Sequence, residues 1–99
     1  MNIRFLEAAQ KEIDEAVEWY NHQSPGLGMR FLYEIDRSLM RICDYPFLCA
    51  KIEPDIRRCL VNKFPYGLIY SIDEDQDVIV IIAAAHLHRR PRYWYDRIV

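Results

Sequence analysis

Apolar residues along the chain first follow a strand-like spacing and then a helical one. Residues 2–6 (NIRFL) alternate around Ile3 and Phe5, which predicts a short opening strand. From residue 7 to about residue 23 the apolar side chains recur three and four positions apart, which predicts an amphipathic helix. Its apolar face consists of Ala9, Ile13, Ala16, Val17 and Tyr20.

The stretch SPGLG at residues 24–28 interrupts this pattern. Ser24 is a favourable helix cap, and Pro25 suits the first position of a helix, where no amide hydrogen is needed. These residues predict the start of a second helix, which should end before Pro46. Its apolar face consists of Leu32, Ile35, Leu39 and Ile42. The two helices are expected to form a hairpin.

The second half of the chain is rich in β-branched and aromatic residues, which predicts strands over residues 56–62, 66–72 and 78–86. The polar DEDQD stretch separates the last two as a tight hairpin. Residues 78–86 are apolar on both faces, so we expect a central strand covered by the helices on one side and by another segment on the other. Pro91 can start a short terminal helix.

These elements predict an α+β fold: an N-terminal strand, a helical hairpin, a three-stranded antiparallel meander and a short C-terminal helix. A length of 99 residues with 52% hydrophobic composition suffices for one core and is too short for two. We therefore expect a single domain spanning residues 1–99.

Charge is unevenly distributed, although the formal net charge is only -2. Acidic residues concentrate in the first predicted helix and in the DEDQD turn. Such segregation creates a local positive field that attracts phosphate groups or acidic protein surfaces. Basic residues concentrate elsewhere, at Arg57, Arg58, Lys63, Arg89, Arg90, Arg92 and Arg97.

Several classes of protein are disfavoured by the sequence. The longest apolar run, residues 78–85, is well short of the roughly 18 residues of a membrane span, and the charged N-terminus does not resemble a signal peptide. The three cysteines form no C-x-x-C pair, which favours reduced thiols in a cytosol. Metal-ligand spacings and glycine-rich phosphate loops are missing. We expect a soluble cytoplasmic protein without a cofactor, a metal or a membrane partner.

Two adjacent arginines lie on one predicted strand. Strand alternation sends Arg58 to the side of Ile56 and Arg57 to the side of Cys59. One of the two must point toward a buried or cleft-forming face. A buried guanidinium requires partners, so it either pairs with a helix glutamate or is available to a phosphate.

The stretch HLHRRPRYWYDR, residues 86–97, follows the end of the apolar strand, where a sheet presents functional groups to solvent. The imidazoles of His86 and His88 can move protons near neutral pH, guanidinium groups can clamp a phosphate, and Tyr93 or Trp94 can stack on a base. RNA cleavage needs such groups. The alternatives are that His86 bonds to the backbone and that Trp94 packs against the sheet.

The stretches IRRCLVNKFPYGLIYSI and AAAHLHRRPRYWYDR, after a helical hairpin containing AVEWY and GMRFLYEIDRSLMRI, resemble the RelE/ParE superfamily of bacterial type II toxin and antitoxin systems. The resemblance covers nearly the whole chain. It implies a small toxin that supports plasmid stabilisation by inhibiting growth, neutralised by a cognate antitoxin.

The superfamily divides into two branches with different targets. The RelE-like branch cleaves messenger RNA on the ribosome without a metal, and Arg58 can replace the first lysine of its pattern. Leu60 and Gly67, however, stand where a second lysine and an arginine would be, while Arg89 or Arg90 and Tyr93 or Tyr95 match its C-terminal arginine and tyrosine only approximately. The ParE-like branch inhibits DNA gyrase. The sequence slightly favours the ParE-like function over an mRNA interferase; a degenerate, non-toxic antitoxin-binding module is the third alternative.

The resulting site predictions fall into two sets. The residues expected to act if the protein is a nuclease are Arg58, His86, His88, Arg89, Arg90 and Tyr93. The residues expected to bind a target or the antitoxin are Arg57, Arg58, Lys63, Arg89, Arg90, Arg92 and Trp94.

Overall fold

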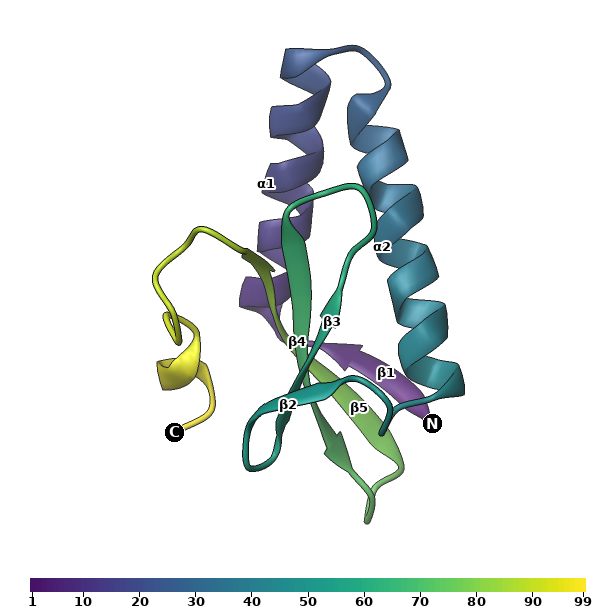
Figure 1. Ribbon diagram of the computed structural model, residues 1–99, viewed down its shortest axis with the longest axis vertical. Helices are drawn as coiled ribbons and strands as arrows, with labels where there is room; N and C mark the ends of the chain where they lie inside the picture. Colours follow the sequence, from purple (N-terminus) through teal and green to yellow (C-terminus); the bar gives the residue numbers. More distant parts are fainter.

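The computed structural model describes residues 1–99 as a helical hairpin packed on one face of a five-stranded mixed sheet (Figure 1). The elements in chain order are β1 (Asn2–Phe5), α1 (Glu7–Gln23), α2 (Leu27–Asp44), β2 (Ala50–Glu53), β3 (Ile56–Leu60), β4 (Tyr66–Asp73), β5 (Val78–His86) and the 3-10 turn η1 (Tyr95–Arg97). The predicted α+β class is confirmed.

The sheet has the strand order β1-β5-β4-β3-β2. β1 pairs with β5 in parallel, and the helical hairpin forms part of the long connection between them, whereas β2 to β5 pair antiparallel with their neighbours. β5 therefore has a partner strand on each side. Its interior position agrees with the apolar character of both its faces.

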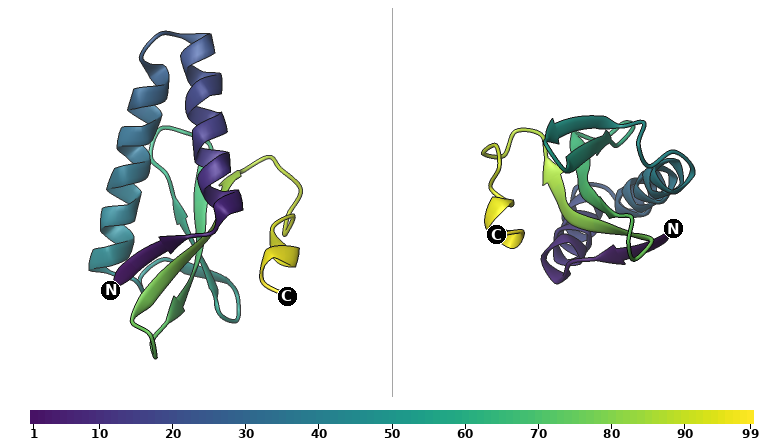
Figure 2. Two further views of the ribbon diagram at one scale, coloured as in Figure 1. Left: turned by 180° about the vertical axis from the view of Figure 1, so that it is seen from behind. Right: turned by 90° about the horizontal axis from the view of Figure 1, so that it is seen from below.

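The sheet carries a hydrophobic core on each face. On the helical face, Phe31 and Ile35 of α2 pack over Tyr70 of β4 and Ile81 of β5, all of which are buried. On the opposite face, Trp94 packs with a smaller cluster that consists of Ile56, Ile69, Ile82, Ala83 and Ala85. The segment that covers the second face of β5 is therefore the C-terminal stretch, which Figure 2 shows on the side of the sheet away from the helices.

Two predictions about elements in the second half were incomplete or wrong. The structure adds a short strand, β2, because residues 50–53 pair with β3. The terminal helix expected from Pro91 is only a 3-10 turn at Tyr95–Arg97. Arg92 has a φ of 61°, in the left-handed region, so a right-handed helix cannot continue through it.

The second helix, α2, begins two residues later than predicted. Ser24 ends α1, with its amide donating to the Tyr20 carbonyl, and α2 starts at Leu27 after Gly26 in a left-handed conformation (φ 87°). Gly28 lets the helices approach closely, since an added Cβ would lie 2.3 Å from the Val17 carbonyl oxygen. Its amide also donates to Asn21 Oδ1 at 2.8 Å.

Neither helix is long and apolar enough to cross a bilayer. No group of three or more His, Cys, Asp or Glu side chains is arranged to hold a metal ion. All three cysteines are free, with Cys59 buried and Cys43 exposed.

Candidate functional site

The C-terminal segment and the face of the sheet that it covers line a cavity of about 260 Å³. Its floor contains Ile69 and Ala85 of the sheet, and its wall contains Trp94. The polar residues that line it are Glu53, Arg58, His86, Arg89, Arg90, Arg92 and Tyr93. The fold thus brings together seven of the ten predicted site residues, although Arg58 lies on β3 and the others follow some 30 positions further along the chain.

The four arginines of this basic cavity differ in what they contact. Arg92 pairs with Glu53 at 3.3 Å, and Arg89 pairs with Glu12 at 3.3 Å while its guanidinium lies 3.8 Å from the centre of the Tyr93 ring. The side chains of Arg58 and Arg90 have neither an ion pair nor a hydrogen bond and belong to exposed residues. Two guanidinium groups at the cavity are therefore free to bind an anionic partner.

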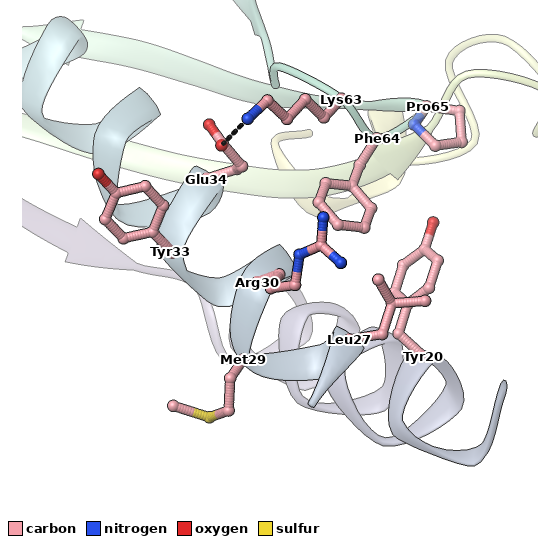
Figure 3. A pocket seen from close by; sticks show the side chains of 9 residues that line it. All are labelled: Tyr20, Leu27, Met29, Arg30, Tyr33, Glu34, Lys63, Phe64 and Pro65. Atoms are coloured by element: carbon pink, nitrogen blue, oxygen red, sulfur yellow. Dashed lines mark ion pairs between the residues drawn. The ribbon is translucent and has the colours of Figure 1, made fainter. Parts of the chain in front are cut away.

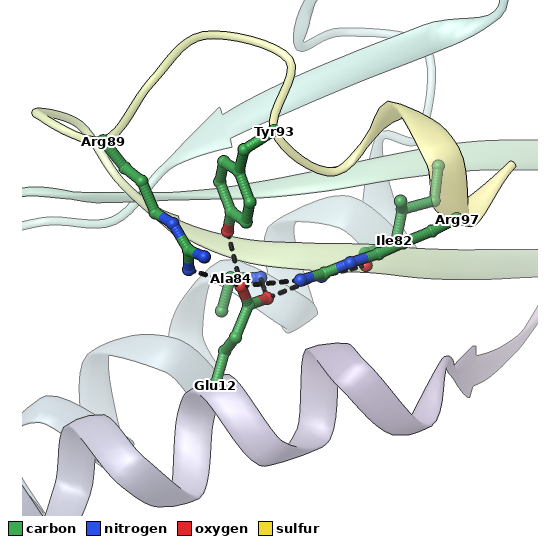
Figure 4. Close-up of polar contacts among 6 residues, drawn as sticks. All are labelled: Glu12, Ile82, Ala84, Arg89, Tyr93 and Arg97. Atoms are coloured by element: carbon green, nitrogen blue, oxygen red, sulfur yellow. Dashed lines mark hydrogen bonds and ion pairs between the residues drawn. The ribbon is translucent and has the colours of Figure 1, made fainter.

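Glu12 of α1 fixes the C-terminal segment, which carries Arg89, Arg90 and Arg92 (Figure 4). Arg97 donates from Nη1 to Glu12 Oε1 at 2.8 Å and from Nη2 to Oε2 at 3.0 Å, the parallel geometry of a strong arginine–carboxylate pair. The Tyr93 hydroxyl donates to Oε2 at 2.6 Å, and the amide of Ala84 in β5 donates to Oε1 at 3.1 Å. One carboxylate thus ties the tail to both α1 and β5.

The environment of Glu12 shifts the ionisation of its partners. Burial, and then the hydrogen bond to Glu12, raise the pKa of the Tyr93 hydroxyl well above its ordinary value. The hydrogen bond to Glu12 also raises the pKa of Arg97. Tyr93 therefore keeps its proton at neutral pH and uses it to donate a hydrogen bond to the Glu12 carboxylate. Its role in the structure is to hold the segment.

His86 is among the residues that line the basic cavity, whereas His88 is not. The His88 amide donates to Nδ1 of His86 at 3.1 Å, and the two rings meet edge to face with their centroids 5.2 Å apart. His86 also contacts the Tyr66 ring. The predicted alternative of a strand-end histidine bonded to the backbone is confirmed. An Nδ1 that accepts a hydrogen bond cannot carry a proton without losing that bond.

Arg57 and Lys63 lie away from the basic cavity. Arg57 points to the helical face, where its Nη1 donates to the carbonyls of Phe47 at 2.8 Å and Cys49 at 2.7 Å. The predicted alternation of Arg57 and Arg58 is confirmed, but neither pairs with a helix glutamate. Lys63 pairs at 3.8 Å with buried Glu34, in a separate pocket beside α2 (Figure 3).

Trp94 packs with its side chain in the core instead of presenting a free face. It is 3% exposed and belongs to the cluster under the cavity, as the packing alternative predicted. A direct stacking role on a ligand is therefore corrected to a supporting role: the indole holds the segment against the sheet and leaves the contacts to the exposed arginines.

Leu60 and Gly67 are directly opposite each other on β3 and β4. Leu60 is 53% exposed, so this part of the surface is apolar. At Gly67 an added Cβ would lie 2.9 Å from Cγ and Cδ of Arg58, which shows that the arginine stem lies over the glycine. A larger side chain at position 67 would displace Arg58 from its present course.

Glu12 makes more polar contacts than any other residue of the site, yet it was not among the predicted site residues. It appeared only as one of several acidic residues of the first helix. One signal was present: Glu12 lies three residues after Ala9 and four before Ala16, both on the buried face of α1. A carboxylate beside an apolar face requires a partner, although sequence alone does not reveal that the partner is Arg97.

Solved toxin structures share this architecture. A chromosomal ParDE toxin–antitoxin structure from P. aeruginosa superposes with a TM-score of 0.76 at 13% identity, covering 89% of this chain and 97% of that chain. A mutant of E. coli toxin RelE in the free state gives 0.74 at 18% identity, covering 99% and 97%. The isolated E. coli RelE toxin gives 0.63 at 18% identity, covering 99% and 98%. The chain therefore has the RelE/ParE fold.

The sequence itself identifies the family. A model that describes the ParE toxin of the type II toxin–antitoxin system parDE matches residues 3–91. The chain belongs to the ParE toxin family, and it is thus a toxin component of the type II toxin–antitoxin class, whose members are paired with an antitoxin. No curated protein sequence is similar enough to this chain to add to these comparisons.

Proposed function

We propose that this protein arrests bacterial growth by binding DNA gyrase through the basic cavity, and that an antitoxin neutralises it. The observation that carries the proposal is the pair of unpartnered guanidinium groups at the cavity, Arg58 on β3 and Arg90 on the C-terminal segment that Glu12 anchors. Unpaired cations on an anchored backbone favour an anionic surface, because no existing ion pair has to break on binding. Membership of the ParE family supports gyrase as the target.

The groups available for acid–base chemistry favour binding over catalysis. RNA cleavage needs a base for the 2′-hydroxyl and an acid for the leaving oxygen. Here Nδ1 of His86 accepts the His88 amide, and the Tyr93 hydroxyl donates to Glu12. Leu60 and Gly67 leave two positions without the cations that the RelE-like pattern places there. Transition-state stabilisation of a phosphate would then rest on the remaining arginines.

Ribosome-dependent mRNA cleavage is the second candidate. Two features favour it: the basic cavity contains both His86 and free arginines, and Nε2 of His86 is not used by any hydrogen bond. An enzyme of this kind would need His86 or His88 for proton transfer and Arg58 with Arg89 or Arg90 for the phosphate. A non-toxic module that only holds its antitoxin is the third.

We also propose that the antitoxin contributes an acidic, partly apolar segment that folds on this protein. The separation of the acidic α1 from the basic cavity supports this, because a disordered partner can supply complementary charge along an extended path. Its contacts would cover the helical hairpin groove and the basic edge of the sheet.

Induced expression without antitoxin tests the target. Translation, transcript integrity and plasmid supercoiling are followed in the same cells. The proposal expects a loss of negative supercoiling and filamentation before translation falls. Early transcript cleavage with normal supercoiling would establish the nuclease instead, and normal growth would establish the non-toxic module. Arg58→Ala should relieve the arrest, whereas Arg4→Ala, an exposed arginine on β1, is the matched control and should not.

A further inference from the structure

α2 presents an apolar stripe to solvent on the side opposite its buried face. Met29 is 62% exposed, Tyr33 59% and Met40 65%. At 3.6 residues per turn, these three positions and Asp36 fall within an arc of roughly 60° on the helix surface. Figure 3 shows Met29 and Tyr33 reaching outward from α2. Their spacing of four, three and four residues is that of a helix-packing seam.

The stripe is symmetric along the helix. Met29 and Met40 are equally distant from its centre, and so are Tyr33 and Asp36. If a second α2 lies antiparallel with a twofold axis at that centre, each Met29 meets the partner copy's Met40. Each Tyr33 then meets the partner copy's Asp36. Such self-complementarity is the requirement for an isologous interface.

The charges on the stripe are also self-complementary. Arg37 folds back onto Tyr33, with its Nη1 3.4 Å from the hydroxyl and its guanidinium 5.8 Å from the ring centre. Neither Asp36 nor Arg37 has an ion pair within the chain. In the antiparallel arrangement the Arg37 guanidinium, held at the Tyr33 hydroxyl, faces the other copy's Asp36, so two ion pairs form across the twofold axis.

We propose that the protein forms a homodimer through antiparallel packing of α2 on α2 of a second copy. Exposed thioethers and an aromatic ring supply the apolar contacts, and Asp36 with Arg37 sets the register. α2 and the C-terminal segment lie on opposite sides of the molecule in Figures 1 and 2. The dimer therefore leaves the basic cavity open, and the inference does not depend on what that cavity binds.

Sedimentation velocity of the protein, over about 1 to 300 µM, tests the proposal with a charge-swap series. Asp36→Arg brings two arginines together, and Arg37→Asp brings two aspartates together, so each single variant should weaken dimerisation by at least about tenfold. The double variant Asp36→Arg/Arg37→Asp exchanges the two charges and should return to within about threefold of the original protein. Glu18→Arg, an exposed reversal on α1, is the control and should leave dimerisation unchanged.

Circular dichroism establishes that each variant is folded, which is expected because Asp36 and Arg37 are both exposed. A protein that stays monomeric throughout the concentration range overturns the proposal and leaves the stripe to the antitoxin. Dimers that neither single reversal weakens, or that the double swap fails to restore, show that the copies associate through another surface.

Discussion

Arg97 and Glu12, separated by 85 positions in sequence, form a two-point ion pair that attaches the C-terminal tail to the first helix. Arg97 also donates to the carbonyl of Ile82 at 3.0 Å, so the same guanidinium is hydrogen-bonded to both α1 and β5. The side chains of Glu12 and Arg97 are 12% and 20% exposed, which shields the pair from solvent screening. This pair anchors the segment that forms one wall of the basic cavity.

Replacing Glu12 by Ala should destabilise the protein by about 2 to 4 kcal/mol, because it leaves Arg97 and the Ala84 amide without their shared acceptor. Denaturant melts measure this loss. Glu15→Ala removes an exposed carboxylate one turn away and should cost less than about 0.5 kcal/mol. Equal effects of the two substitutions would mean that the tail is not anchored through Glu12.

Alkaline pH should weaken the fold through its buried tyrosines. Burial is the main cause that raises the pKa of Tyr20, Tyr66, Tyr70 and Tyr93 above the ordinary 10.0. A raised folded-state pKa gives stability that is complete below pH 10.0 and is lost as pH rises toward the folded-state pKa. Tyrosinate absorbance should show these four tyrosines titrating above pH 10.0. In Tyr93→Phe the alkaline loss of stability should be smaller; a single titration step for all tyrosines would contradict this.

Substitutions of the neighbouring arginines Arg57 and Arg58 should affect different properties: the stability of the fold for Arg57 and antitoxin binding for Arg58. Arg57→Ala breaks two hydrogen bonds to backbone carbonyls and should lower the free energy of unfolding by about 1 to 3 kcal/mol. Arg58→Ala should leave stability within about 0.5 kcal/mol but weaken antitoxin binding. Calorimetry at increasing salt checks the second part, since affinity for an acidic partner should fall with ionic strength. Affinity independent of salt and of Arg58 would argue against the electrostatic contact.

Ile81 provides a test of the sheet assignment. It is fully buried in β5 beneath the helices, so Ile81→Ala should cost roughly 2 to 5 kcal/mol in denaturant melts. Leu60→Ala, on the exposed face of β3, is the comparison and should cost less than about 0.5 kcal/mol. A loss well under 1 kcal/mol for Ile81→Ala would contradict its burial.

The sequence predicted elements well where the hydrophobic pattern was long and bounded by turn residues. The first helix, residues 7–23, and the last strand, residues 78–86, have the predicted bounds because periodicity and turn residues agree there. β2 was missed because AKIE is short and polar, and only its pairing with β3 makes it a strand. The parallel pairing of β1 with β5 joins residues more than 70 positions apart, for which no local signal exists.

The site was predicted in part for the same reason. Arg58 and residues 86–94 were recognised from their chemistry, and the cavity joins them. What each arginine contacts depends on tertiary partners: Arg57 finds carbonyls, whereas Arg89 finds Glu12. Arg92 ends the predicted helix through a left-handed backbone that a non-glycine residue rarely adopts. Composition does not encode such a conformation.

The most direct test of the binding mechanism is inhibition of purified DNA gyrase by two matched double variants. The account predicts that wild-type protein inhibits supercoiling, and that His86→Ala/His88→Ala does so within about twofold of its potency because imidazole chemistry is not used. Arg58→Ala/Arg90→Ala should be at least about tenfold weaker, since it removes the free guanidinium groups. No inhibition by folded wild-type protein, or a loss of potency confined to the histidine variant, would contradict the account.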